Sequence, residues 1–97
     1  MFARVATFQS DPGRLDDTVE MVRKEVAGET PEGLKGARML MLIDRESGKS
    51  IGITLFDSEE AMRRGDQTLN AIDPGSTERR QTVEFYEVPV ETLSASR

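Results

Sequence analysis

The pattern of apolar and polar positions along the chain predicts four strands and two helices. Residues 1–9, 37–44, 49–56 and 81–90 are dense in apolar or β-branched side chains, which is typical of strands. After the first strand, apolar residues recur at spacings of four, three and four along one helix face: Leu15, Val19, Val22 and Val26. A thinner helical stripe follows the third strand: Ala61, Met62, Gly65, Leu69 and Ile72.

Residues typical of helix starts and turns support the same division. Asp11 is placed to cap the first helix, and Pro12 suits the first helical position, where no amide hydrogen is needed. Asp57 is placed to cap the second helix and, with Glu60 three residues on, forms a pair that resembles a capping box; Ser58 is the alternative cap. Gly48 can take the positive φ that a tight turn between the second and third strands requires. Those two strands are therefore expected to form a hairpin.

The order strand, helix, strand, strand, helix, strand predicts an α+β fold of the ferredoxin-like type, with a split βαβ (βαββαβ) arrangement. In this fold a four-stranded antiparallel sheet carries both helices on one face. We expect a single domain over residues 1–90, with loops at 29–36 and 73–78, and a flexible tail over residues 91–97.

The second face of the predicted sheet also carries apolar side chains. Residues 39–43 are five consecutive apolar residues, and side chains alternate along a strand, so both faces of this strand are apolar. The predicted elements leave no segment to cover the face opposite the helices. We therefore expect a homodimer in which two sheets pack against each other, as in a dimeric α/β barrel.

Pairing Asp44 with Lys49 in the hairpin divides its side chains into two sets. One set is aliphatic: Leu40, Leu42, Ile51, Ile53 and Leu55. The other is mixed: Ala37, Met39, Met41, Ile43, Gly52, Thr54 and Phe56. Adaptable methionines, a hydroxyl, a ring and a missing side chain suit a ligand cavity between sheet and helices. The candidate ligand contacts in this set are Met39, Met41, Thr54 and Phe56. Ordinary packing against the helices explains the same set, and a one-residue slip of the hairpin would exchange the two sets.

Composition removes several classes of function. Among the 97 residues, 13 basic and 18 acidic side chains leave a net charge of −5, which disfavours nucleic-acid binding. The arginine doublets at 63–64 and 79–80 are expected to be ion-paired surface.

Without cysteine, histidine or tryptophan, thiol catalysis, histidine bases and the usual zinc sites are excluded, so we expect no metal. No apolar run approaches the ~20 residues of a membrane span, and we expect a cytoplasmic protein.

Three polar residues are candidates for chemistry. Tyr86, the only tyrosine, could exchange a proton with an aromatic substrate, or could serve as a core or interface ring. Arg4 lies among apolar neighbours in the first strand, where a guanidinium needs a partner. That partner could be Glu84 or Glu87 of the adjacent last strand, or an anion. Asn70, near the end of the second helix, could contact a ligand or face solvent.

Four segments carry a resemblance to a known family. They are residues 1–5 (MFARV), 31–36 (PEGLKG), 42–45 (LIDR) and 55–61 (LFDSEEA). In these the chain resembles the dimeric α/β-barrel superfamily, in particular its antibiotic-biosynthesis-monooxygenase-like members, over nearly its whole length. The resemblance implies sheets paired face to face and a ligand held between sheet and helices.

Activities in that family vary, and include oxygenation of polyphenolic rings without a cofactor, quinol oxidation and haem degradation. Haem-degrading members hold iron through a histidine, aided by an asparagine and a tryptophan. This chain has no histidine or tryptophan, so haem degradation is not expected. Anthrone-type oxygenases use asparagine, tryptophan and tyrosine, for which this chain offers only Asn70 and Tyr86.

The resemblance therefore implies a monooxygenase that needs no cofactor and acts on a small aromatic or quinol ligand between sheet and helices. The alternative is a non-catalytic protein of the same fold, which binds a small apolar molecule or only dimerises.

Overall fold

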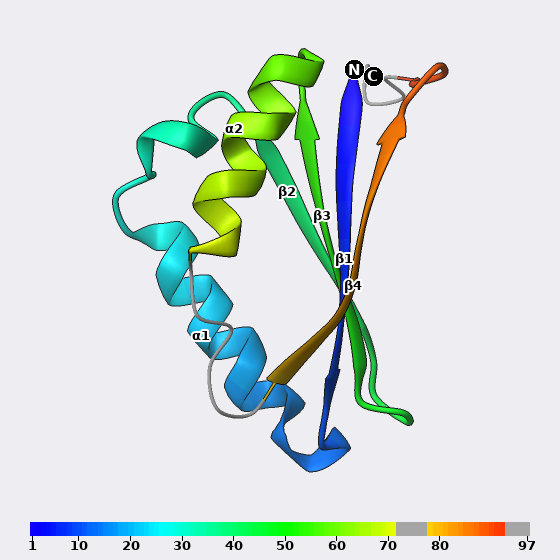
Figure 1. Cartoon of the computed structure of the whole chain (residues 1–97). Helices are drawn as coiled ribbons and strands as arrows, with labels where there is room; N and C mark the ends of the chain where they lie inside the picture. Colours follow the sequence, from blue (N-terminus) through cyan, green and yellow to red (C-terminus); the bar gives the residue numbers. More distant parts are fainter. Residues whose placement is uncertain (72–77, 93–97) are drawn as a thin grey trace.

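The computed structural model describes residues 1–71 and 78–92. Its strands are β1 (Phe2–Ser10), β2 (Arg38–Asp44), β3 (Lys49–Phe56) and β4 (Glu78–Glu87). Its helices are α1 (Leu15–Ala27) and α2 (Glu59–Asn70), and short 3-10 turns occur at Pro12–Arg14 and Glu32–Leu34. Figure 1 shows that the elements follow the order predicted from the sequence.

The four strands form one antiparallel sheet in the order β2-β3-β1-β4. The first and last strands of the chain are therefore neighbours, and the two β-α-β halves interleave. Both helices lie on the same side of the sheet, and the other side is open (Figure 1). The predicted ferredoxin-like α+β fold is confirmed.

The hairpin between β2 and β3 has the predicted register, with Asp44 opposite Lys49. Its turn contains Gly48 at a φ of 82°, a conformation that L residues rarely adopt. A Cβ at Gly48 would also meet the carbonyl oxygen of Ser10. The turn therefore needs glycine both for its backbone conformation and for its close contact with β1.

The register assigns each hairpin side chain to one face, because residues paired directly across neighbouring strands point the same way. Arg4 pairs with Thr54 and bonds to α2, so both belong to the face that the helices cover. The mixed set lies on this face: Met39, Met41, Ile43, Gly52, Thr54 and Phe56. The aliphatic set lies on the open face: Leu40, Leu42, Ile51, Ile53 and Leu55. The aliphatic set and the strand residues of the mixed set are confirmed. Ala37, predicted with the mixed set, precedes β2 and packs against the core.

The packed core lies between α2 and the sheet. Leu34, Phe56 and Met62 are buried and contact one another there. Gly65 of α2 is buried against Phe56, and a Cβ at this position would overlap the ring. The missing side chain therefore allows α2 to approach β3 closely.

The first helix is buried most deeply at its N-terminal end. Leu15 and Thr18 are fully buried, whereas Val26 is 63% exposed although it belongs to the same side of α1. The apolar stripe predicted for this helix is thus only partly used in packing. Its C-terminal half leaves space between helix and sheet.

The helix starts differ in detail from the sequence expectation. Asp11 accepts a hydrogen bond from the amide of Gly13 at 3.0 Å, but the first turn after it is a 3-10 turn. Ser58 caps α2, because its Oγ accepts from the amide of Ala61 at 3.1 Å. Of the two caps considered, the structure uses Ser58 and not Asp57.

The last strand runs from Glu78 to Glu87, three residues earlier at each end than predicted. It pairs with β1 along its whole length through an irregularity between Thr7 and Phe8. The strand ends before Pro89, which has no amide hydrogen to donate. Ile72, most of the loop predicted at 73–78 and most of the tail predicted at 91–97 lie outside the described residues.

The open face of the sheet exposes large apolar side chains. Leu40, Leu42 and Tyr86 are 53%, 45% and 50% exposed, and they alternate with helix-facing residues along β2 and β4. Single exposed hydrophobic residues are ordinary, but a continuous apolar sheet face is typical of an interaction surface.

In the described part of the chain, no helix has the length and apolarity needed to cross a membrane.

Candidate functional site

A cavity of about 450 Å³ lies between the sheet and the helices. Its floor comes from three strands: Ala6, Phe8, Met39, Met41, Gly52 and Thr54. Its walls come from α1, the loop that follows it, and α2: Met21, Val22, Val26, Pro31, Leu34 and Leu69. The volume and the apolar lining suit a small organic molecule.

Two small residues and one loosely packed helix create this space. Ala6 and Gly52 pair directly across β1 and β3, so little side-chain volume rises from the middle of the sheet. A Cβ at Gly52 would have only one neighbouring atom within 4 Å, a ring carbon of Phe8 at 3.9 Å. Because the second half of α1 also stands away from the sheet, the gap above Gly52 is not filled.

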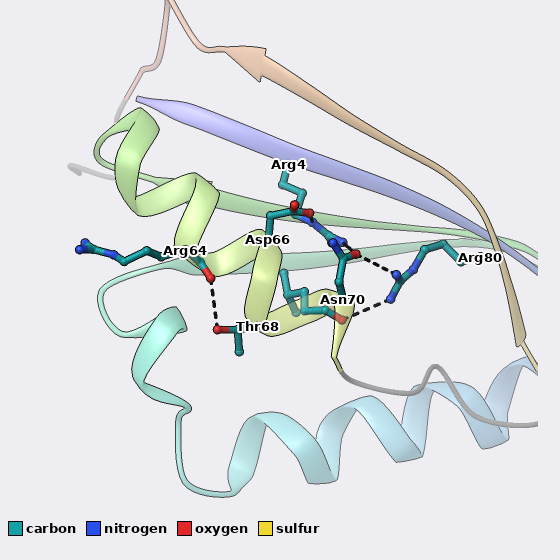
Figure 2. A network of polar contacts seen from close by, with 7 residues as sticks. Arg4, Arg64, Asp66, Thr68, Asn70 and Arg80 are labelled. Atoms are coloured by element: carbon teal, nitrogen blue, oxygen red, sulfur yellow. Dashed lines mark hydrogen bonds and ion pairs between the residues drawn. The ribbon is translucent and has the colours of Figure 1, made fainter.

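One end of the cavity is polar and is built around Arg4 of β1 and Arg80 of β4, called the arginine pair below. Arg4 donates from Nε to Oδ1 of Asp66 at 2.8 Å and from Nη2 to Oδ1 of Asn70 at 3.2 Å. Arg80 donates from Nη1 to the same Asn70 oxygen at 3.0 Å, and from Nη2 to the Leu69 carbonyl at 3.3 Å. The amide oxygen of Asn70 therefore links the two guanidinium groups (Figure 2).

The arginine pair carries two positive charges against one bonded carboxylate. Arg4 is 3% exposed, and its ionic partner is Asp66. Arg80 is half-buried, its guanidinium lies 5.9 Å from the centre of the Phe8 ring, and its Nε is buried without a hydrogen-bond partner in the described structure. A buried donor without an acceptor is costly. A ligand does not reach that enclosed nitrogen, but the excess positive charge at this end of the cavity favours a ligand that brings an acceptor or a negative charge.

The structure brings together four of the five ligand contacts predicted from the sequence. Phe56 lies on the same face of the sheet but is buried in the core beside Met62 and does not line the cavity. The four that line the cavity are Arg4, Met39, Met41 and Thr54. Asn70 does not line the cavity; this exposed residue accepts hydrogen bonds from both members of the arginine pair.

Tyr86 is separated from this cavity by the sheet. It pairs with Ala3 in the register, and its 50% exposed ring is on the open face, opposite to Arg4. The neighbouring Glu84 carboxylate raises the pKa of the Tyr86 phenol, so this group gives up its proton less readily than usual. Its position suits an interface ring better than contact with a ligand between sheet and helices.

Two expectations about arginines need correction. Arg4 bonds to Asp66 of α2 and not to Glu84 or Glu87 of β4. Glu84 pairs with Val5 and so points to the open side, away from Arg4. Glu87 is on the same face as Arg4 but pairs with Phe2, two residues away along β1, whereas Asp66 of α2 lies within 2.8 Å of the guanidinium. Arg80 is not an ion-paired surface residue either, since it lines the cavity and bonds to neutral oxygens.

The other doublet behaves as expected in part, because Arg63 pairs with Glu59 on the exposed side of α2 at 2.8 Å. Sequence reasoning missed Asp66 as part of the site. The signal was present, since Asp66 and Asn70 are four residues apart and so lie on one helix face beside Leu69. An arginine in the first strand could have been paired with that carboxylate.

The described residues offer no cluster of three or more His, Cys, Asp or Glu side chains that could hold a metal ion. The charged residues that line the cavity are the arginine pair and the exposed Glu25 of α1. The chemical character of the site is thus an apolar chamber with a cationic end.

The likeness to known proteins is one of structure. No protein-family model matches the sequence, and no curated protein matches it. The structure superposes on that of a "putative antibiotic biosynthesis monooxygenase" from Deinococcus radiodurans with a TM-score of 0.57, over 96% of this chain and 97% of that chain. This chain has the antibiotic-biosynthesis-monooxygenase-like fold. At 14% sequence identity the match shows the fold alone, and the resemblance expected from the sequence is confirmed at that level.

Proposed function

We propose that this protein binds a small aromatic or quinol ligand between sheet and helices and oxygenates it with molecular oxygen, without a cofactor. The observation that carries the proposal is the apolar cavity of about 450 Å³ with a cationic end. Met39 and Met41 offer adaptable apolar contacts to a ring system, and the arginine pair offers donors to a ring oxygen.

The proposed chemistry depends on the substrate more than on the protein. An electron-rich phenol or quinol that has lost its proton can pass an electron to oxygen directly. With an anthrone, the ring methylene loses two hydrogens and gains one oxygen atom, while the second oxygen atom leaves as water. The protein's own contribution is to orient the ring, keep bulk water from it and hold its oxygen.

The proposal includes a homodimer in which the open sheet faces of two chains pack together, an arrangement typical of this fold. The exposed apolar residues of that face support it, with Leu40 and Leu42 on the edge strand β2 and Tyr86 on the opposite edge strand β4. Such an interface would bury about 1,600 Å² in total if it is of standard size.

A cytoplasmic location also belongs to the proposal, and the absence of cysteine is compatible with a reducing compartment.

The second candidate is a protein that binds the same kind of molecule without turning it over. The position of Tyr86 favours this alternative, because the only tyrosine lies on the far side of the sheet from the cavity. Asp66 is engaged by Arg4, so it is not a free base. Under this alternative a ligand raises the melting temperature by mass action and is recovered unchanged.

The test is oxygen uptake by chelator-treated protein with anthrone or a naphthoquinol, read together with thermal denaturation. With anthrone, oxygenation predicts uptake above the buffer rate, formation of anthraquinone, and loss of both in Gly52→Leu, whose side chain would fill the cavity floor. With the naphthoquinol, conversion to the quinone would be an oxidation that reduces oxygen to hydrogen peroxide without transfer of an oxygen atom. A rise in melting temperature without uptake would favour the non-catalytic alternative. If neither ligand changes melting temperature or oxygen uptake, the proposed ligand class is wrong.

A further inference from the structure

The arginine pair has a consequence for the charge of the ligand. Two guanidinium groups share one amide oxygen, that of Asn70, and one carboxylate, that of Asp66, accepts from Arg4 alone (Figure 2). Among the described residues no oxygen accepts from Nη1 of Arg4 or from Nε of Arg80. The site therefore holds an excess positive charge. Nη1 of Arg4 is the donor left for a ligand, because Nε of Arg80 is enclosed by protein.

We infer that the cavity selects the ionised form of a phenolic ligand and that the arginine pair, not a protein base, drives that ionisation. The bound phenol loses its proton to solvent water, its O–H electron pair stays on the oxygen, and the oxygen accepts hydrogen bonds from the guanidinium groups. The inference rests on the proposed function, because it takes this cavity to be the ligand site.

Two features of the site support ionisation of the phenol beside the arginine pair. Arg4 is held rigidly at 3% exposure by Asp66 and Asn70, so its charge is fixed and poorly hydrated. Low hydration strengthens the attraction between a guanidinium and a phenolate. The surrounding walls are apolar, which would disfavour a lone anion anywhere else in the cavity. An ionised oxygen is therefore favoured only beside the arginine pair.

The other charged side chains near the arginine pair do not cancel its excess positive charge. Asp66 on α2 bonds Nε of Arg4 and neutralises one of the two charges. Glu25 on α1 lines the cavity but is exposed to solvent, which screens it. On β4, Glu84 pairs with Val5 and lies on the other face of the sheet, whereas Glu87 lies on the same face as Arg4 but pairs with Phe2 and forms no ion pair with Arg4. One uncompensated guanidinium charge remains on the cavity side.

The chemical consequence is that the site needs no histidine and no tyrosine to generate the reactive form of its substrate. An opposite charge within about 4–6 Å favours an ionised group by roughly ten- to a thousandfold. A phenol that is mostly neutral in water at neutral pH would thus be mostly ionised when bound. Neutral aromatics of the same size should bind more weakly than the phenolate.

The test uses 4-nitro-1-naphthol, whose colour reports its ionisation, beside 1-nitronaphthalene, which has the same rings and no hydroxyl. Absorbance titration across pH gives the ionisation midpoint of the naphthol free and bound. The inference predicts a midpoint for the bound naphthol at least one pH unit lower, corresponding to tenfold or greater preference for the ionised form. It also predicts at least tenfold tighter binding of the ionised naphthol than of 1-nitronaphthalene.

The decisive variant is Asn70→Asp, which keeps the shape of the side chain and places a second carboxylate between the two guanidinium groups. The fold should be at least as stable, because a carboxylate accepts those hydrogen bonds more strongly than an amide. The preference for the ionised naphthol should disappear, whereas 1-nitronaphthalene should bind as before.

Arg80→Met should lose most of the preference for the ionised naphthol, and Arg80→Lys should keep part of it. The matched control is Arg63→Met, which removes an exposed arginine outside the cavity.

The outcomes separate the two proposals. If both compounds bind equally well and the bound naphthol ionises like the free one, the inference is wrong while the cavity remains a ligand site. If Asn70→Asp binds the ionised naphthol as tightly as the parent, the arginine pair is not the anchor and the inference is wrong. If neither compound binds, the proposed function fails and the inference fails with it.

Discussion

Asp66 accepts a hydrogen bond from Nε of Arg4 at 2.8 Å, and the two side chains are only 23% and 4% exposed. In each of the other ion pairs among the described residues, both side chains are at least 37% exposed. This pair joins α2 to the central strand β1 at the polar end of the cavity. It therefore connects the stability of the fold to the architecture of the site.

Asp66→Ala should destabilise the protein by about 2–4 kcal/mol, because it leaves the buried guanidinium of Arg4 without its counter-charge. Urea unfolding followed by circular dichroism measures this loss. Asp17→Ala is the matched control, since its partner Arg14 is exposed and the expected change is below about 0.5 kcal/mol. Equal effects of the two substitutions would show that the buried pair contributes no more than a surface pair.

Gly65→Ala should lower stability by about 1–3 kcal/mol, although alanine normally favours helices. The added Cβ would overlap the ring of Phe56, so α2 would have to move away from β3. The control is Gly28→Ala at the end of α1, where φ is −81° and a Cβ would make only ordinary contacts. A stabilised Gly65→Ala variant in thermal denaturation would contradict the close packing of α2.

Asp44→Asn should weaken the hairpin at neutral pH and lose this effect in acid. The amide of Glu46 and the hydroxyl of Ser47 donate to the carboxylate and lower the pKa of Asp44 below 3.8. A lowered folded-state pKa gives stability that is present above the unfolded-state value and is lost as pH falls through the folded-state value. Urea midpoints of parent and variant should therefore differ at pH 7 and converge below about pH 4. A difference that stays constant over this range would show that the charge of Asp44 is irrelevant.

Leu42→Glu should convert the proposed homodimer to monomers, because it places a charge on the apolar open face of the sheet. Sedimentation velocity over a range of concentrations measures the change. Val90→Glu is the control, since Val90 is 78% exposed beyond the end of β4. A parent protein that is monomeric at all concentrations would contradict the packing of sheet on sheet, and the aliphatic face would need another partner.

The fold was predictable from the sequence because its signals are local and repeated. Apolar spacing defined both helices, and the pairing of Asp44 with Lys49 sorted the hairpin residues into two sets that each share one face of the sheet. The extent of β4 was less predictable, since its first residues pair with β1 only through an irregularity at Thr7 and Phe8. Such a register shift depends on the partner strand and leaves no pattern in β4 itself.

The candidate site was only partly predictable. Met39, Met41 and Thr54 were found because the hairpin register alone places them on one face. The arginine pair needed tertiary contacts between β1, α2 and β4, which bring together residues more than sixty positions apart. Tyr86 was singled out by its chemistry, but the side of the sheet it occupies depends on the pairing of β4 with β1.

The most direct test of the central claim is the NMR spectrum of methyl-labelled methionines during titration with anthrone or a naphthoquinol. The chain has five methionines, and they divide cleanly between the cavity and other regions. Met21, Met39 and Met41 line the cavity, whereas Met1 lies near Arg38 and Met62 is buried in the core. A ligand held between sheet and helices should shift the first three methyl signals in a saturable way and leave the other two nearly unchanged. Saturable binding without shifts of the three cavity methyls would contradict the account, because the ligand would then occupy a different surface.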